Sequence, residues 1–240
     1  NKQNKKKIKV KSSKKVLWDS LNNKLNKQCK TEWCWNKQLL NLPGIFRPDM
    51  PSKWKKNPRE WLDSNNIINV MKQYETKYDD FQFLGAVPLD FMKLDFLNIH
   101  NLDFDKLLGK NKKKLGMVIN LDEHDEPGSH WVGLFTDLLK KKLYFFDSYG
   151  HKPEKQIKDF MRKIEKYFNA NLSEGNLNNK DYDIKYNKIR HQYKSSECGV
   201  YSMNFIIRLL RGDNFKTVSQ SKVIDDEINK CRKSYFSSKK

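Results

Sequence analysis

Apolar residues recur at helical spacing in four segments of the chain. The first segment follows Asp63 or Ser64, either of which can cap a helix, and it covers about three turns. The others extend over residues 157–168, 198–211 and 222–235, and Gly212 ends the third. The pattern predicts four amphipathic helices. Their apolar stripes comprise Ile67, Val70, Met71 and Tyr74; Ile157, Phe160, Met161, Ile164, Tyr167 and Phe168; Val200, Met203, Ile207 and Leu210; and Val223, Ile224, Ile228 and Cys231.

Short apolar runs rich in Val, Ile and aromatic residues predict strands at residues 116–121, 131–135 and 143–146. The polar and basic residues 136–142 suit the connection of a hairpin between the last two strands. Residues 170–183 are rich in Asn and Gly and predict a loop. Helices and strands mix without βαβ regularity, which predicts an α+β fold.

Length and composition narrow the class of protein. Of the 240 residues, 37% are hydrophobic and 32% are charged, and the length predicts one domain with ample residues for a core. No run of about 18 apolar residues occurs, so we expect no membrane partner. Four cysteines are too few for a disulfide scaffold, which favours an intracellular protein. We expect a disordered lysine-rich arm at 1–15, a Trp-rich extension at 16–60 and a catalytic domain at 61–240.

The net charge of +19 is concentrated at the N-terminus. Residues 1–15 contain eight lysines and no acidic residue. Clustered lysines can bind DNA by releasing counterions from its phosphates. They can equally form a solvated tail, and the abundance of Lys and Asn, whose codons are A-rich, also follows from an AT-rich genome. Both interpretations of the arm stay open.

Cys198 is the candidate nucleophile. It lies where a loop of small polar residues meets the start of the third predicted helix, and Gly199 follows it. Unpaired N–H groups and the positive end of the helix dipole favour a thiolate at such a position. A buried structural thiol is the alternative for a single cysteine.

A nucleophilic cysteine needs a base and a group that orients this base. His130 precedes one strand of the predicted hairpin and Asp147 follows the other. Because adjacent antiparallel strands place the start of one beside the end of the next, we expect these two residues to be neighbours. Gln192, six residues before Cys198, is a candidate donor to an oxyanion. Cys29 and Cys34 lack further ligands at zinc spacing, so we expect no metal and no cofactor.

The order His130-Trp131, Asp147 and Gln192-x5-Cys198-Gly199 resembles the ubiquitin-like-protein protease clan of cysteine proteases. This clan includes the SUMO, NEDD8 and adenovirus proteases. The segment that starts Trp61-Leu62-Asp63-Ser64 is similar to the helix start of SUMO proteases. The viral likeness is to the polyprotein-processing protease of African swine fever virus, and it rests on Ile189-Arg190-His191-Gln192, Glu197-Cys198-Gly199-x-Tyr201-Ser202 and Val223-Ile224-x-Asp226-Glu227.

The resemblance implies a variant of the papain-like fold, with a central mixed sheet flanked by helices. It implies that Cys198 is the nucleophile, His130 the base, Asp147 the group that orients His130, and Gln192 the oxyanion donor.

The same resemblance assigns Trp61 and Trp131 to a narrow tunnel over the scissile bond. A place in the hydrophobic core is the alternative for both side chains.

The sequence therefore predicts a monomeric cysteine endopeptidase of a large DNA virus that infects amoebae. We expect cleavage after Gly-Gly or Gly-Ala in structural polyprotein precursors, in the host cytoplasm or viral factory, by an enzyme packaged in the virion. One alternative is a SUMO- or NEDD8-like deconjugase with the same chemistry. Another is a non-catalytic virion protein that binds nucleic acid, which labelling of Cys198 by a thiol-directed probe would exclude.

Overall fold

The computed structural model of the protein describes residues 14–25, 47–170 and 181–237. The chain divides into two compact units, Asn1–Phe46 and Arg47–Lys240. All of the helices and strands that the sequence predicts fall within the second unit.

The described part of the first unit is helix α1 (Lys14–Leu25). The last two lysines of the predicted arm belong to this helix, whereas residues 1–13 lie outside the described residues. Cys29 and Cys34 also lie outside them.

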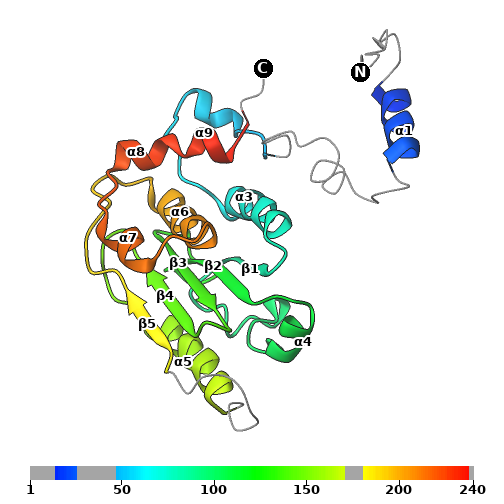
Figure 1. The fold of residues 1–240 in the computed structure, drawn as a ribbon. Coiled ribbons are helices and arrows are strands. Elements are labelled where there is room, and N and C mark those ends of the chain that lie inside the picture. The colour runs from blue at the N-terminus through cyan, green and yellow to red at the C-terminus, as the bar shows by residue number, and fades with distance from the viewer. Residues whose placement is uncertain (1–13, 26–46, 171–180, 238–240) are drawn as a thin grey trace, which may run out of the picture. The chain divides into compact units, whose positions relative to one another are not determined.

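The second unit is built around a mixed sheet, in which the strands of the described residues pair in chain order from β1 to β5 (Figure 1). The outer pairs, β1 with β2 and β4 with β5, are parallel, and the inner pairs are antiparallel. Strands β3 and β4 form the predicted hairpin. The strands are β1 (Phe81–Val87), β2 (Lys114–Asn120), β3 (Trp131–Asp137), β4 (Lys142–Phe146) and β5 (Asp183–Tyr186).

Helices cover both faces of this sheet (Figure 1). Because side chains alternate along a strand, β3 contributes Trp131 and Phe135 to a core shared with α3 and α6, and Val132 and Leu134 to a core shared with α5. Every residue of β3 is therefore buried. The helices of this unit are η2 (Ser52–Lys55), α3 (Ser64–Lys77), η3 (Asp95–Leu97), α4 (Phe104–Gly109), α5 (Lys155–Ala170), α6 (Cys198–Leu210), α7 (Phe215–Gln220), α8 (Asp225–Lys230) and α9 (Arg232–Tyr235).

The mixed sheet between helices is the α+β architecture that the sequence predicted. Helices α3, α5 and α6 and strands β2, β3 and β4 confirm the periodic segments. The Asp63 carboxylate accepts a hydrogen bond from the backbone N–H of Asn66 at 2.7 Å, so Asp63 is the cap of α3.

The predicted extent of the last helix, residues 222–235, is wrong. It is divided into α8 and α9, which meet at Cys231. It also begins three residues later than predicted, because Val223 lies in the preceding loop, where its carbonyl accepts a hydrogen bond from the Tyr201 hydroxyl at 2.7 Å. The predicted stripe thus extends over a loop and two short helices, and one of its members, Ile224, is 52% exposed.

Strand β1 has no counterpart among the predicted strands. Gly85 has a φ of 128°, and the register between β1 and β2 shifts between Phe83 and Gly85. This irregularity interrupts the alternation of apolar and polar residues on which the sequence analysis depends.

Residues 47–60 belong to the second unit, although the sequence analysis assigned them to an N-terminal extension. The buried Trp54 packs edge-on against Phe236, with ring centroids 4.8 Å apart. The backbone N–H of Met50 donates to the carbonyl of Ser237 at 2.8 Å. The segment is therefore fixed to the end of the described chain.

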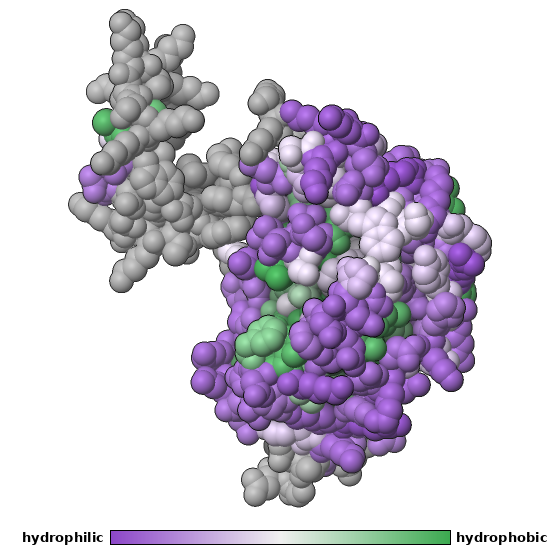
Figure 2. Space-filling model, turned by 180° about the vertical axis from the view of Figure 1, so that it is seen from behind, coloured by the Kyte–Doolittle hydropathy of each residue, from purple (hydrophilic) through white to green (hydrophobic). Residues whose placement is uncertain are grey.

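Hydrophilic side chains dominate the face of the molecule shown in Figure 2, with apolar patches near its middle. Of the helices in the described ranges, none is long and apolar enough to cross a membrane.

Candidate active site

Cys198 is the first residue of α6, and its side chain is buried. The apolar stripe of α6 packs this helix against β3, which fixes the position of its N-terminus. The Ser202 hydroxyl lies 2.9 Å from the carbonyl of Cys198 and 3.0 Å from that of Trp131, so it joins the first turn of α6 to the start of β3. The thiol is thereby held beside the residue that precedes β3.

That residue is His130, and the hairpin places it next to Asp147. Nε2 of His130 lies 2.7 Å from Oδ1 of Asp147, and both side chains are buried. The Cys198 thiol also interacts with His130, and this interaction is one of the causes that raise the pKa of the imidazole. Because Nε2 faces the carboxylate, Nδ1 is the ring nitrogen that remains for the thiol. The imidazole therefore bridges a carboxylate and a thiol.

The surroundings of His130 favour its charged form. Burial lowers the pKa of the imidazole, but the hydrogen bonds with Asp147 and Cys198 and the charges of both groups outweigh burial and raise this pKa to about 9. An imidazolium beside a thiol is the state in which a thiolate is stabilised.

Two residues that the sequence analysis missed hold the pair in place. Asn187 accepts from the backbone N–H of Asp147 at 2.9 Å and donates to its carbonyl at 2.7 Å. The Tyr149 ring stacks on His130, with centroids 4.5 Å apart and 14° between the planes, and its N–H donates to the Asp147 carboxylate at 2.8 Å. Neither contact has a local signal in the sequence, since each depends on chain segments meeting in space.

Gln192 is buried in the loop before α6. Its side-chain oxygen accepts from the Ser148 hydroxyl at 2.6 Å, and its side-chain nitrogen donates to the carbonyl of Lys194 at 2.6 Å. The second hydrogen of the amide is free of these two bonds. The role of oxyanion donor stays a prediction.

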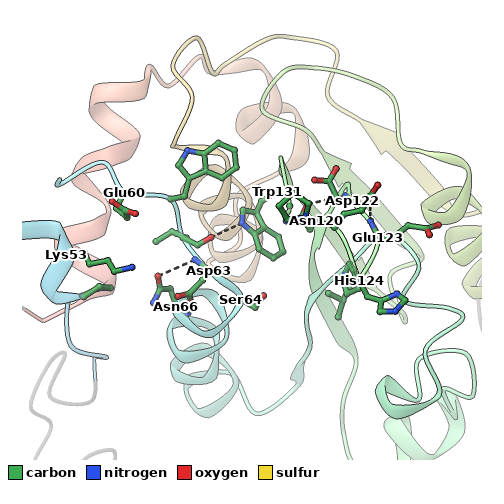
Figure 3. A pocket seen from close by; sticks show the side chains of 18 of the residues that line it. Lys53, Glu60, Asp63, Ser64, Asn66, Asn120, Asp122, Glu123, His124 and Trp131 are labelled. Carbon is green, nitrogen blue, oxygen red and sulfur yellow. Dashed lines mark hydrogen bonds between the residues drawn. The ribbon is translucent and has the colours of Figure 1, made fainter.

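Trp61 and Trp131 line the same cleft, which has a volume of about 750 Å³ (Figure 3). Trp61 is 42% exposed, whereas Trp131 is 5% exposed and belongs to the core as well. The indole N–H of Trp131 donates to the carbonyl of Leu62 at 2.9 Å. Gly199 packs against both Leu62 and Trp131, which places this end of the cleft beside the candidate nucleophile.

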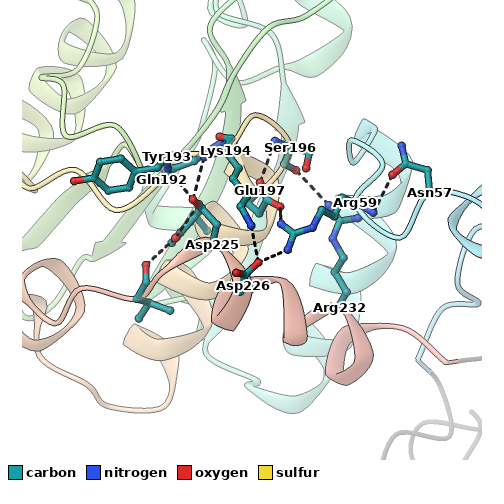
Figure 4. A network of polar contacts seen from close by, with 12 residues as sticks. Asn57, Arg59, Gln192, Tyr193, Lys194, Ser196, Glu197, Asp225, Asp226 and Arg232 are labelled. Atoms are coloured by element: carbon teal, nitrogen blue, oxygen red, sulfur yellow. Dashed lines mark hydrogen bonds and ion pairs between the residues drawn. The ribbon is translucent and has the colours of Figure 1, made fainter.

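A buried carboxylate, Glu197, immediately precedes Cys198. It pairs with Arg59 at 2.7 Å, and Arg59 also contacts Asp226 (Figure 4). The buried Arg232 donates to the carbonyl of Ser196 at 3.2 Å. These contacts connect the loop before α6 to α8 and α9.

The other histidines have contacts of their own. His124 bonds Asp90 at 2.6 Å, and the buried His191 bonds the Ser219 carbonyl at 3.0 Å. His151, whose side chain is 74% exposed, lies 3.3 Å from Asp147. Within the described ranges, no group of His, Cys, Asp and Glu is arranged to hold a metal ion.

Comparisons with known proteins agree with this geometry. Residues 103–240 match the Ulp1 protease family, C-terminal catalytic domain. A protein of Acanthamoeba polyphaga mimivirus that is described as a thiol protease is 36% identical over 95% of this chain and 76% of its own length. A cysteine protease of African swine fever virus is 23% identical over 82% of this chain and 75% of its own.

A solved structure shows the same fold. The crystal structure of the African swine fever virus protease superposes with a TM-score of 0.66 at 21% identity, over 97% of this chain and 94% of that one. Together, the family match and the viral relatives show that this chain belongs to the Ulp1 protease family and is a cysteine protease.

Proposed function

We propose that Cys198, His130 and Asp147 are the catalytic triad of this protease. The observation that supports this assignment is the position of His130, which is hydrogen-bonded to Asp147 and interacts with Cys198. In this proposal, the Cys198 thiolate attacks the scissile carbonyl carbon, and His130 gives its proton to the leaving amine as the C–N bond breaks. Water then adds to the acyl-enzyme while His130 takes its proton, and the thiolate leaves.

The proposed oxyanion site consists of the backbone N–H of Cys198, at the start of α6, and the amide of Gln192. The first N–H groups of a helix have no partner within the helix, and they suit a developing negative charge.

We propose that the substrates are viral structural polyproteins, cut inside linkers after Gly-Gly or Gly-Ala. Trp61 and Trp131 line one cleft, and two of its lining residues, Leu62 and Trp131, contact Gly199. Residues without a Cβ pass most easily between two indoles, and this argument favours glycine before the scissile bond. The mimivirus and swine fever virus relatives favour a large DNA virus as the setting, with the enzyme in the viral factory and the virion.

The triad is tested with point variants. Cys198→Ala and His130→Ala should each reduce kcat by about 10⁴-fold or more, because nucleophile and base act as one unit. Asp147→Asn should retain part of the activity, since an amide oxygen can still orient the imidazole. Circular dichroism should show an unchanged fold, and His100→Ala is the matched control. Full activity of Cys198→Ala would refute the assignment.

The substrate is tested with short peptides that contain an internal Gly-Gly, beside SUMO and NEDD8 fusions. We expect internal cleavage of the peptides, with residues tolerated on both sides. Trp61→Ala should relax the requirement for glycine. Cleavage of a fusion without cleavage of any peptide would instead identify a deconjugase, which needs the surface of a folded modifier.

A further inference from the structure

The cleft that contains Trp61 and Trp131 has a charge opposite to that of the chain. Its volume is about 750 Å³, and five carboxylates and one lysine are among the residues that line it. The whole chain, in contrast, has a formal charge of +19. The carboxylates belong to Glu60, Asp63, Asp122, Glu123 and Glu126, and the lysine is Lys53.

The carboxylates come from opposite walls of the cleft. Glu60 and Asp63 belong to the segment that leads into α3, and Asp122 and Glu123 belong to the connection between β2 and β3 (Figure 3). A chain segment in the cleft would therefore have negative charge on both sides. Low-dielectric walls around a concave site concentrate such a field.

Few cations neutralise these groups. Within the described ranges, one of the five carboxylates forms an ion pair. Glu123 lies 3.6 Å from Lys93, and both side chains are exposed. Such a pair is weak in water. The ring of His124 also lines the cleft, but it bonds Asp90 at 2.6 Å.

The other polar contacts of these carboxylates are with neutral groups. Glu60 accepts from the Asn57 amide at 3.0 Å, and Asp122 accepts from the Ser129 hydroxyl at 2.7 Å. Asp63 and Glu126 each accept from a backbone N–H, at 2.7 Å and 2.9 Å. Such bonds hold the carboxylates in place without adding a positive charge beside them.

Aromatic surface accompanies the charge. Trp61 is 42% exposed and Phe96 is 79% exposed, and both line the cleft. Lysine and arginine side chains place their methylene groups on apolar surface and their charged ends in polar surroundings, and a cation over an aromatic face is attracted to the ring. Aromatic rings beside carboxylates thus fit basic side chains better than acidic or purely apolar ones.

We propose that this cleft selects substrate segments with Lys or Arg side chains near the scissile bond. The inference rests on the proposed function and narrows its substrate class to basic linkers with a Gly-Gly-like pair. Acidic linkers are disfavoured, because their carboxylates would face those of Glu60, Asp63, Asp122 and Glu123.

The first test measures kcat/KM of the full chain on matched peptides, which share the Gly-Gly core and carry Lys, Gln or Glu at the positions around it. We expect the lysine peptide to be cut about tenfold faster than the glutamine peptide and the glutamate peptide to be cut most slowly. Added NaCl should reduce the preference. Equal kcat/KM for the three peptides would overturn the proposal.

The second test assigns the preference to the cleft. In the double variant Asp122→Asn/Glu123→Gln, the ratio of lysine to glutamate peptide should fall at least threefold. Asp105→Asn, which removes a charge from the exposed face of α4 outside the cleft, is the matched control and should leave the ratio unchanged. A ratio that the double variant leaves unchanged would overturn the proposal.

The third test does not require cleavage. Binding of the same peptides to Cys198→Ala, followed by fluorescence anisotropy, should show the same order of affinity. If no Gly-Gly peptide is cut but the lysine peptide still binds best, the proposed cleavage site fails and the cleft proposal stands. If the lysine peptide bound only after removal of residues 1–13, the chain's own lysines would be the ligand of the cleft. This result would overturn the proposal.

Discussion

The imidazole of His130 lies between a carboxylate and a thiol, and this position determines the pH range in which the site works. Its pKa of about 9 means that the imidazolium persists below that pH and is lost as the pH rises through it. If the active state is a thiolate paired with an imidazolium, kcat/KM should fall on the alkaline side near pH 9. The pH profile on a Gly-Gly peptide measures this limb.

Asp147→Asn provides the control for the pH profile. The charge of Asp147 and its hydrogen bond both raise the pKa of His130. Because Asp147→Asn removes the charge and weakens the hydrogen bond, the pKa of His130 should fall and the alkaline limb should move to lower pH. An alkaline limb near pH 6.5 in the unmodified enzyme would contradict the effect assigned to Asp147 and Cys198.

Sequence patterns predicted those residues of the candidate site whose positions follow from a single helix or a single hairpin. Cys198 was identified by the start of an amphipathic helix, and the proximity of His130 and Asp147 by the two ends of a hairpin. Asn187, Tyr149 and Arg59 have no such signal. Their contacts join loops that are far apart in the sequence, and no periodicity describes such loops.

At the scale of elements, the site depends on how α6 packs against β3. A Cβ added at Gly133 would lie 2.9 Å from the Phe205 ring and 3.2 Å from the Ser202 carbonyl, so α6 would have to move. Gly133→Ala should lower the free energy of unfolding by about 1–3 kcal/mol. It should also reduce kcat, because Cys198 moves with α6 and His130 stays with β3. Chemical denaturation and peptide kinetics measure the two effects.

Gly109→Ala is the matched control for this change. No atom lies within 4 Å of the added Cβ, and Gly109 is the last residue of α4. Alanine there should leave kcat unchanged and stabilise the protein by up to about 1 kcal/mol. Equal kcat for Gly133→Ala and Gly109→Ala would show that the contact of α6 with β3 tolerates a methyl group and does not set the triad geometry.

The loop before α6 depends on an ion pair with a fully buried partner. The Glu197 side chain has no exposed surface, whereas Arg59 is about one third exposed. Arg59→Met should lower the free energy of unfolding, since a buried carboxylate loses its cation. Arg162→Met, which breaks the exposed pair with Asp159, should lower the free energy of unfolding much less, because an exposed ion pair contributes little in water. Similar losses in the two variants would contradict a structural role of the Arg59–Glu197 pair.

The elements themselves were predictable where one period extends over several turns. Helices α3, α5 and α6 have long stripes, and β3 and β4 have uninterrupted apolar runs. Strand β1 was missed because the alternation of apolar and polar residues is interrupted at Gly85. The end of the chain looked like one helix because α8, α9 and the loop before them all bury apolar residues on the same core. Periodicity reports burial, and it does not report where the backbone turns.

At the scale of the whole molecule, charge is distributed unevenly between the two units. The first 46 residues contain twelve lysines and two acidic residues, and so have a net charge of +10, while the remaining 194 residues have +9. The sequence predicted this asymmetry directly, because it is a matter of counting. It did not predict an acidic cleft, since the carboxylates of that cleft come from separate segments on two walls.

The asymmetry predicts that the lysines of residues 1–13, and not the second unit, dominate any binding of DNA. Lysines that neutralise phosphates release counterions, so the affinity should fall steeply with salt, by about 0.9 logarithmic units per phosphate contact for each tenfold rise in salt. Removal of residues 1–13, which contain six lysines, should weaken binding and flatten this dependence.

A chain with the same 13 residues in scrambled order should bind as the natural one does, because charge and not sequence is recognised. Fluorescence anisotropy on duplex DNA between 50 and 300 mM NaCl, on the order of the range over which such contacts are lost, measures both quantities. An unchanged affinity and slope after the removal would show that these lysines form a solvated tail.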